Sequence, residues 1–181
     1  MKKIALGIIA FLTLIITSGC SMDNTPTKKV ENYLNNYKSL NETVLDQLDK
    51  VVDSDTIMTA SQKNEYKDIL KRQYQNLTYK IKDEVINGND ATVNVEIEVY
   101  DYYKINKESD SYYQTMPDEF KDANGNMKEE KYIDYKLEKL KNYKERVTYT
   151  IDFYLKKVDK TWVMQDINED TRSKIHGLYA Y

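Results

Sequence analysis

The chain has 181 residues, enough for one ordinary domain, with 27 basic and 30 acidic side chains and a mildly negative net charge. The charges of both signs are interspersed, which excludes the basic patches typical of nucleic-acid binding or polybasic membrane contact. The single cysteine excludes an internal disulfide, and the single histidine, His176, excludes the usual histidine-rich zinc sites. The sequence has no glycine-rich phosphate-binding motif, so it predicts no cofactor and no metal.

The first residues have the pattern of an export signal. Lys2 and Lys3 precede an apolar stretch of 13 residues at positions 4–16, and the small residues Ser18 and Gly19 follow. A helix needs about 20 apolar residues to cross a bilayer, so this stretch is too short to remain as a membrane span. We therefore expect residues 1–19 to be a signal peptide.

Thr17-Ser18-Gly19-Cys20 resembles the lipobox of bacterial lipoproteins, although that family prefers Leu where this chain has Thr17. The resemblance implies that the Cys20 thiol receives a diacylglyceryl group and becomes the mature N-terminus. Two acyl chains suffice for stable anchoring. The implied location is the outer face of a Gram-positive cytoplasmic membrane, and a Gram-negative envelope stays open. The alternative is a plain signal peptide followed by a free cysteine.

Residues 20–27 are polar and predict a tether to a single domain over residues 28–181. Thr25 and Pro26 are typical of a helix start. Apolar residues then recur every three or four positions from Val30 to Val51, which predicts one helix of about 25 residues. A second helix is expected to begin at a capping box formed by Thr59 and Gln62.

The apolar period changes to two from residue 77, which predicts an antiparallel hairpin over residues 77–99. A loop of residues 87–89 would place Tyr79 opposite Ile97, Lys80 opposite Glu96 and Val85 opposite Ala91. This register points Asp83 inward and Glu84 outward.

The second half predicts a polar loop over residues 104–130, a helix over residues 129–143, and a second hairpin. In that hairpin, Asp159-Lys160 forms the turn and Leu155 faces Met164. The last twelve residues are expected to pack against the sheet edge as a mobile tail, with His176 at the surface or in packing. The expected fold class is α+β, with N-terminal helices packed on a curved, cone-like antiparallel sheet of about four strands.

The segments NGNDATVNVEIEV and YLKKVDKTWVMQDI resemble strand pairs of the nuclear transport factor two-like superfamily. The resemblance implies a sheet wrapped around the long first helix, forming a cone that can hold a ligand. Short Gram-positive lipoproteins of unknown function carry such domains, and other members are isomerases or hydrolases. Fold alone implies no activity.

Two groups of residues are candidates for function. A pocket within the cone would be lined by Asp83, Tyr33, Tyr37, Tyr79 and Tyr149, although tyrosines at these positions are also compatible with an ordinary core. An outward patch of Tyr100, Tyr102, Tyr112 and Tyr113 would suit a protein contact. We expect a non-catalytic binding or assembly domain whose partner is an envelope protein or a small ligand. The alternatives are a small hydrolase or isomerase using Asp83, or a secreted ligand carrier.

Overall fold

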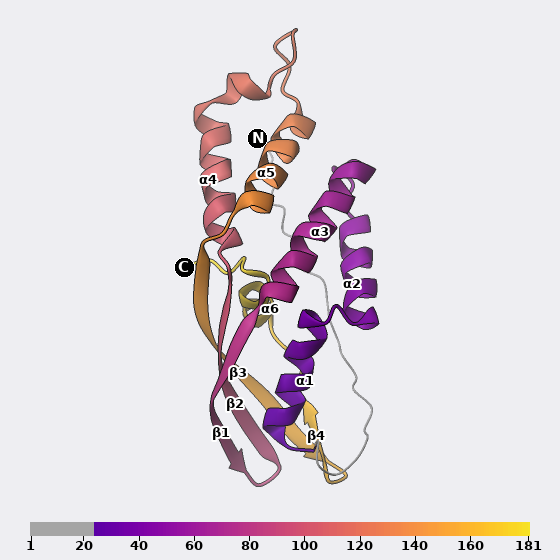
Figure 1. Cartoon of the computed structure of the whole chain (residues 1–181), viewed down its shortest axis with the longest axis vertical. Helices are drawn as coiled ribbons and strands as arrows, with labels where there is room; N and C mark the ends of the chain where they lie inside the picture. Colours follow the sequence, from indigo (N-terminus) through magenta and orange to yellow (C-terminus); the bar gives the residue numbers. More distant parts are fainter. Residues whose placement is uncertain (1–23) are drawn as a thin grey trace.

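Helices pack against one antiparallel sheet in the computed structural model, which describes residues 24–181 (Figure 1). The expected α+β class is confirmed. The predicted signal peptide and Cys20 lie outside the described residues.

The sheet has four strands in the order in which they follow along the chain, and it is curled but not closed. Its strands are β1 (Thr78–Asn87), β2 (Asp90–Tyr100), β3 (Arg146–Val158) and β4 (Thr161–Met164). Alternating residues of β2 and β3 are buried, so the sheet has one core face and one face toward solvent.

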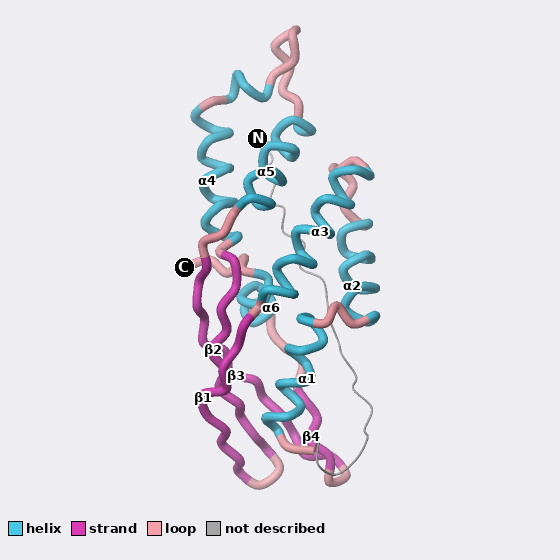
Figure 2. Tube along the Cα trace, viewed as in Figure 1, coloured by secondary structure: helices cyan, strands magenta, loops and turns pink. Residues whose placement is uncertain are grey.

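Three helices precede the sheet: α1 (Pro26–Lys38), α2 (Glu42–Asp53) and α3 (Ala60–Asn76). Between β2 and β3 the chain forms α4 (Tyr102–Thr115), the short 3-10 helix η1 (Pro117–Phe120) and α5 (Glu129–Asn142). The final helix is α6 (Glu169–His176). The molecule is elongated: the α4–α5 hairpin projects at one end, and the β1–β2 and β3–β4 turns lie at the other (Figures 1 and 2).

The expected single N-terminal helix is wrong, because the chain breaks between α1 and α2. Leu40 has a positive φ of 51°, a left-handed conformation that ends α1. Asn41 then caps α2, its side-chain oxygen accepting from the amides of Thr43 and Val44. The apolar spacing continues across the break, which is why periodicity alone did not reveal it.

The register predicted for the first hairpin is correct only for the residues of β1 that precede Lys82. Tyr79 faces Ile97 and Lys80 faces Glu96, as expected. A β-bulge at Lys82 then shifts the pairing by one residue, so that Asp83 faces Asn94. As a result, each residue of β1 after Lys82 points to the sheet face opposite to the predicted one.

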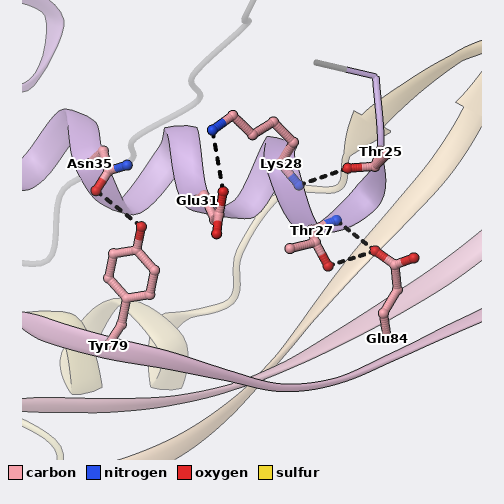
Figure 3. Close-up of polar contacts among 7 residues, drawn as sticks. All are labelled: Thr25, Thr27, Lys28, Glu31, Asn35, Tyr79 and Glu84. Carbon is pink, nitrogen blue, oxygen red and sulfur yellow. Dashed lines mark hydrogen bonds and ion pairs between the residues drawn. The ribbon is translucent and has the colours of Figure 1, made fainter. Parts of the chain in front are cut away.

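Two residues below the bulge therefore face the opposite way from the prediction. Val85 pairs with Thr92 instead of Ala91, and Val85 is exposed. Glu84 turns toward the helices and accepts hydrogen bonds from the backbone amide and hydroxyl of Thr27, at 2.8 and 2.6 Å (Figure 3). Because the first turn of α1 has no acidic residue of its own, this carboxylate supplies the negative charge that a helix N-terminus favours.

The predicted loop over residues 104–130 is wrong in its first half, which is helix α4. Asp101 caps this helix by accepting from the amide of Lys104 at 3.0 Å. Only Tyr102, Ile105 and Ser109 are buried along it, at helical spacing. This narrow buried stripe explains why a mostly polar segment resembled a loop.

Other predictions are confirmed. Thr25 caps α1 with Pro26 in its first turn, and Thr59 and Gln62 form the capping box of α3. Leu155 faces Met164 across the turn in the second hairpin. The expected packing of the tail against the sheet edge is correct only in part: α6 contacts α3 and the inner strand β2, and Ile175 is fully buried.

Candidate functional site

The described chain begins at the sheet end that carries the two hairpin turns. The Asn24 side chain donates to the backbone oxygen of Lys160 at 2.8 Å and accepts from the amide of Trp162 at 2.9 Å. Both partners belong to the β3–β4 turn region. Asn24, the first described residue, is therefore fixed at this end of the domain.

Helix α1 leads directly from this point and lies along β1 (Figure 3). Thr25 accepts from the amide of Lys28 at 3.1 Å, and Glu84 holds the next residue, Thr27. Further along, the Tyr79 hydroxyl donates to the Asn35 side chain at 3.0 Å. These contacts hold residues 24–38, the start of the described domain, against the sheet.

The predicted pocket tyrosines Tyr33 and Tyr37 are core residues, each 1% exposed. Their hydroxyls lie 3.2 Å apart and hydrogen-bond to one another. Burial raises the pKa of Tyr37 to about 12, partly opposed by the bond to Tyr33. The two rings also contact Phe153 and Tyr74 edge to face.

The remaining pocket candidates do not join this pair. Asp83 is exposed, because the bulge at Lys82 turns it away from the core face, so its predicted inward position is wrong. Tyr79 is half-buried beside α1, and Tyr149 donates to the backbone oxygen of Tyr179 at 3.3 Å. Apart from the bonded pair Tyr33 and Tyr37, the residues predicted as one pocket thus have separate structural contacts.

His176 belongs to the same aromatic core. Its Nδ1 lies 3.1 Å from the Tyr74 hydroxyl, and its ring packs near Tyr37. Burial, and secondarily the charge of Arg172, lower the pKa of His176 to about 4. The expected packing role of this histidine is confirmed, whereas the expected mobile tail is wrong.

The predicted contact patch divides into two unrelated sites. Tyr102 is buried, and its hydroxyl donates to the Ile69 backbone oxygen at 3.3 Å and accepts from Arg72 at 3.1 Å. Tyr100 is half-buried, with the guanidinium groups of Arg72 and Arg146 over its ring at 4.7 and 5.2 Å. The outward positions of Tyr100 and Tyr102 were predicted by extending the strand alternation. The strand β2 ends at Tyr100, however, and Asp101 caps α4.

Tyr112 and Tyr113 lie on α4, far along the hairpin from that junction. Together with Phe120, Tyr132 and Tyr135 they form an aromatic group that we call the tip cluster. Phe120 is buried at its centre, with ring centroids between 5.2 and 6.2 Å from the other four. Met116 and Met127 flank the cluster and are 46% and 40% exposed. Sequence reasoning identified two of the five aromatic residues and missed Phe120, within the predicted loop, and Tyr132 and Tyr135, in the predicted helix that follows it.

A charged group fastens the tip cluster to the rest of the hairpin. Lys136 is 3% exposed, and its ammonium lies 3.1 Å from an Asp110 carboxylate oxygen. The same oxygen accepts from the Tyr132 hydroxyl. Asp110 and Tyr132 lie on facing helices, so this contact joins α4 to α5 and explains a lysine inside the protein.

The structure offers no metal centre or membrane span within the described range. Over residues 24–181, no set of three or more His, Cys, Asp or Glu side chains is arranged to hold a metal ion. Within the same range, no helix combines the length and apolar character needed to span a bilayer.

No protein-family model, curated protein or solved structure matches the chain.

Proposed function

We propose that the chain is a bacterial lipoprotein, anchored through diacylglyceryl Cys20 on the extracytoplasmic face of the cell membrane, whose domain is a non-catalytic binding or assembly module. The Ser-Gly-Cys sequence after an apolar run supports the anchor. In this proposal the domain belongs to the nuclear transport factor two-like superfamily. The curled sheet agrees with that resemblance, while the break at Leu40 departs from the long first helix that the resemblance implies.

One observation supports the binding role: the α4–α5 hairpin, which carries the tip cluster, and the β3–β4 turn, to which Asn24 is bonded, lie at opposite ends of the long axis (Figure 1). Asn24 is fixed at the end with the β3–β4 turn. A domain tethered there presents the α4–α5 hairpin away from the lipid. Tethering also raises the effective concentration of that hairpin for partners in the envelope.

The composition of the tip favours a protein partner. Half-exposed Tyr112 and Tyr113 beside the exposed side chains of Met116 and Met127 are residue types enriched at the centres of interfaces. The polar groups beneath them, Asp110 and Lys136, are already bonded to one another. We infer that the tip contributes contact area and no chemistry.

The anchor is tested by the intact mass of protein extracted from membranes, wild type against Cys20→Ala. We expect a wild-type mass equal to residues 20–181 plus a diacylglyceryl group, and no such species in the variant. A released protein without the added mass would overturn the anchor and make the secreted ligand carrier the leading function.

The binding role is tested by a photo-crosslinking amino acid at Met116, with the same substitution at Ile57 as control. Both side chains are similarly exposed, at 46% and 47%, but Ile57 lies in the α2–α3 connection. We expect a discrete cross-linked envelope protein from position 116 alone, and its loss when Tyr113 is also changed to Ala. Equal patterns from both positions would contradict a specific site at the tip.

A further inference from the structure

We propose that the end of the sheet beside Asn24 is a lipid-contacting surface, which inserts shallowly into the bilayer and holds the domain upright. The proposal deepens the proposed function and rests on its lipid anchor. It assigns a role to exposed apolar residues that the fold does not need.

Exposed apolar side chains gather at this end of the molecule. Of the nine large apolar residues that are exposed within residues 24–181, five lie at the ends of the two hairpins. These five, which we call the base patch, are 45 to 57% exposed: Val85, Ile86, Tyr154, Val158 and Val163. Large exposed apolar groups that cluster in this way mark interaction surfaces.

The two hairpin ends that carry the base patch are joined to one another. The amide of Lys157 donates to the backbone oxygen of Asn89 at 2.7 Å, which links the β3–β4 end to the β1–β2 turn. On the outer face, Val85 pairs with Thr92, and Thr92 pairs with Tyr154. Val85, Tyr154, Val158 and Val163 therefore share the outer face from β1 to β4, while Ile86 lies at the same end on the opposite face of β1, across from Ala91.

The rest of the outer sheet face is different in character. Toward the other end of the same strands, the outward positions are occupied by Glu96, Glu98, Thr148 and Thr150. Large exposed apolar side chains thus join the polar ones on the outer face toward the hairpin ends, and none of them belongs to the core.

The position of the proposed anchor indicates that lipid is what this surface contacts. Asn24 is bonded to Lys160 and to Trp162 within the β3–β4 hairpin, and it follows Cys20 by four residue steps. Each step spans at most about 3.8 Å, so Asn24 lies within roughly 15 Å of a lipidated Cys20. An apolar surface held that close to a bilayer meets the headgroup region before any other partner.

The contact is expected to depend on apolar burial and to be largely independent of lipid charge. Lys156 and Lys160 stand at this end, but Asp90 and Asp159 stand beside them. The charges offset each other, whereas the Val, Ile and Tyr side chains are the types that enter the headgroup and acyl boundary. The occupant is thus a lipid surface that need not be anionic.

The test uses residues 20–181 coupled through Cys20, the only thiol, to a maleimide lipid in phosphatidylcholine vesicles. The coupling is chemical, so a failure of natural lipidation, which the mass measurement detects, does not affect this result. Tryptophan is introduced in place of Val158 at the base patch or, as the matched control, Met116 at the tip, with wild-type Trp162 emission subtracted. The vesicles carry brominated acyl chains, which quench tryptophan only at close range.

We expect Val158→Trp to lose about half or more of its added emission to the brominated lipid, as a side chain at the acyl boundary does, and Met116→Trp to lose none. The quenching should persist at high salt. Equal quenching at both positions, or none at 158, would overturn the proposal. A blue shift at 158 without bromine quenching would also overturn it, because a second copy of the chain would then cover the surface.

Discussion

Buried tyrosine hydroxyls shape this core, because each must find a hydrogen-bond partner or lose the bonds it makes with water. Tyr33 and Tyr37 bond to each other, and Tyr74 bonds to His176. Phenylalanine at these positions would need no partner. The Tyr74–His176 pair therefore joins α3 to α6 by a matched polar contact, while the Tyr33–Tyr37 pair satisfies both hydroxyls within α1.

The Tyr33–Tyr37 pair should show strong coupling in a double-mutant cycle. Tyr33→Phe or Tyr37→Phe alone leaves one buried hydroxyl without its partner and should cost about 1 kcal/mol of unfolding free energy. The double variant removes both hydroxyls and should cost clearly less than the sum. Urea unfolding of the four proteins measures the coupling. Simple additivity would show that the 3.2 Å contact contributes nothing.

His176 should make the domain less stable in mild acid. Its folded pKa of about 4 lies below the ordinary value of 6.5, so the unfolded chain binds more protons between these two values. Stability is therefore complete above about pH 6.5 and falls as the pH drops toward 4, by about 2 kcal/mol at pH 5.

Urea unfolding at pH 7 and pH 5 measures this loss, and His176→Gln is the control. Because the chain has a single histidine, the loss between these pH values should largely disappear in the variant. An unchanged loss would assign it to carboxylates instead.

At the scale of elements, the C-terminal end of α6 is the point of the fold that tolerates an added side chain least. Gly177 has a φ of 70°, and its backbone oxygen accepts from the amide of Tyr103 at 2.7 Å. A side chain at this position would collide with the backbone oxygen of Tyr100 and with Gln73. The Gln73 amide nitrogen donates to the backbone oxygens of Tyr100 and His176, at 3.0 Å each, and so connects α3, β2 and α6.

Gly177→Ala should thus be far more damaging than Gly88→Ala. Both positions have a positive φ, but an added Cβ at Gly88 meets nothing. Gly88→Ala should cost about 1 kcal/mol of backbone strain, and Gly177→Ala at least about 2 kcal/mol more. Thermal unfolding of both variants compares them. Equal costs would mean that α6 moves away without penalty.

The elements that sequence reasoning predicted are those with a strong local signal. Thr59 and Gln62 form a complete capping box, and Asp159-Lys160 sets a two-residue turn, so α3 and the second hairpin were identified correctly. The break at Leu40 and the bulge at Lys82 have no such signal. A leucine rarely adopts a positive φ, and a bulge is an extra residue whose reason, the contact of Glu84 with α1, lies far away in the sequence.

At the scale of the molecule, the central strand and the tip should differ in local stability. The inward residues of β2 are almost completely buried, and β2 is paired on both sides. The outer part of α4 contacts mainly α5 and η1, whereas α5 also packs against α3, where the Gln62 side chain donates to the backbone oxygen of Glu130 and to Asp134. Hydrogen exchange followed by mass spectrometry should show residues 110–132 exchanging through local opening while residues 91–99 wait for global unfolding. Equal protection of the two segments would contradict this division.

The candidate site was less predictable than the fold for the same physical reason. Cys20 is proposed as the anchor from its immediate neighbours alone, which the sequence displays. The tip cluster depends on Phe120 lying between α4 and α5, and Asp83 depends on the register below Lys82. Contacts between segments that are distant in the sequence determine the tip cluster and the position of Asp83, and a local sequence pattern does not contain this information.

The long-range bonds at both ends of the domain have a consequence for its biogenesis. Asn24 needs Lys160 and Trp162, and Gln73 needs His176, so neither bond can form until more than a hundred further residues are present. A polypeptide crossing a membrane through a narrow translocation channel must stay unfolded during transit. In the export that we propose for this chain, these bonds can form only after the last helix has crossed the membrane, so the first and last segments of the domain are fastened late.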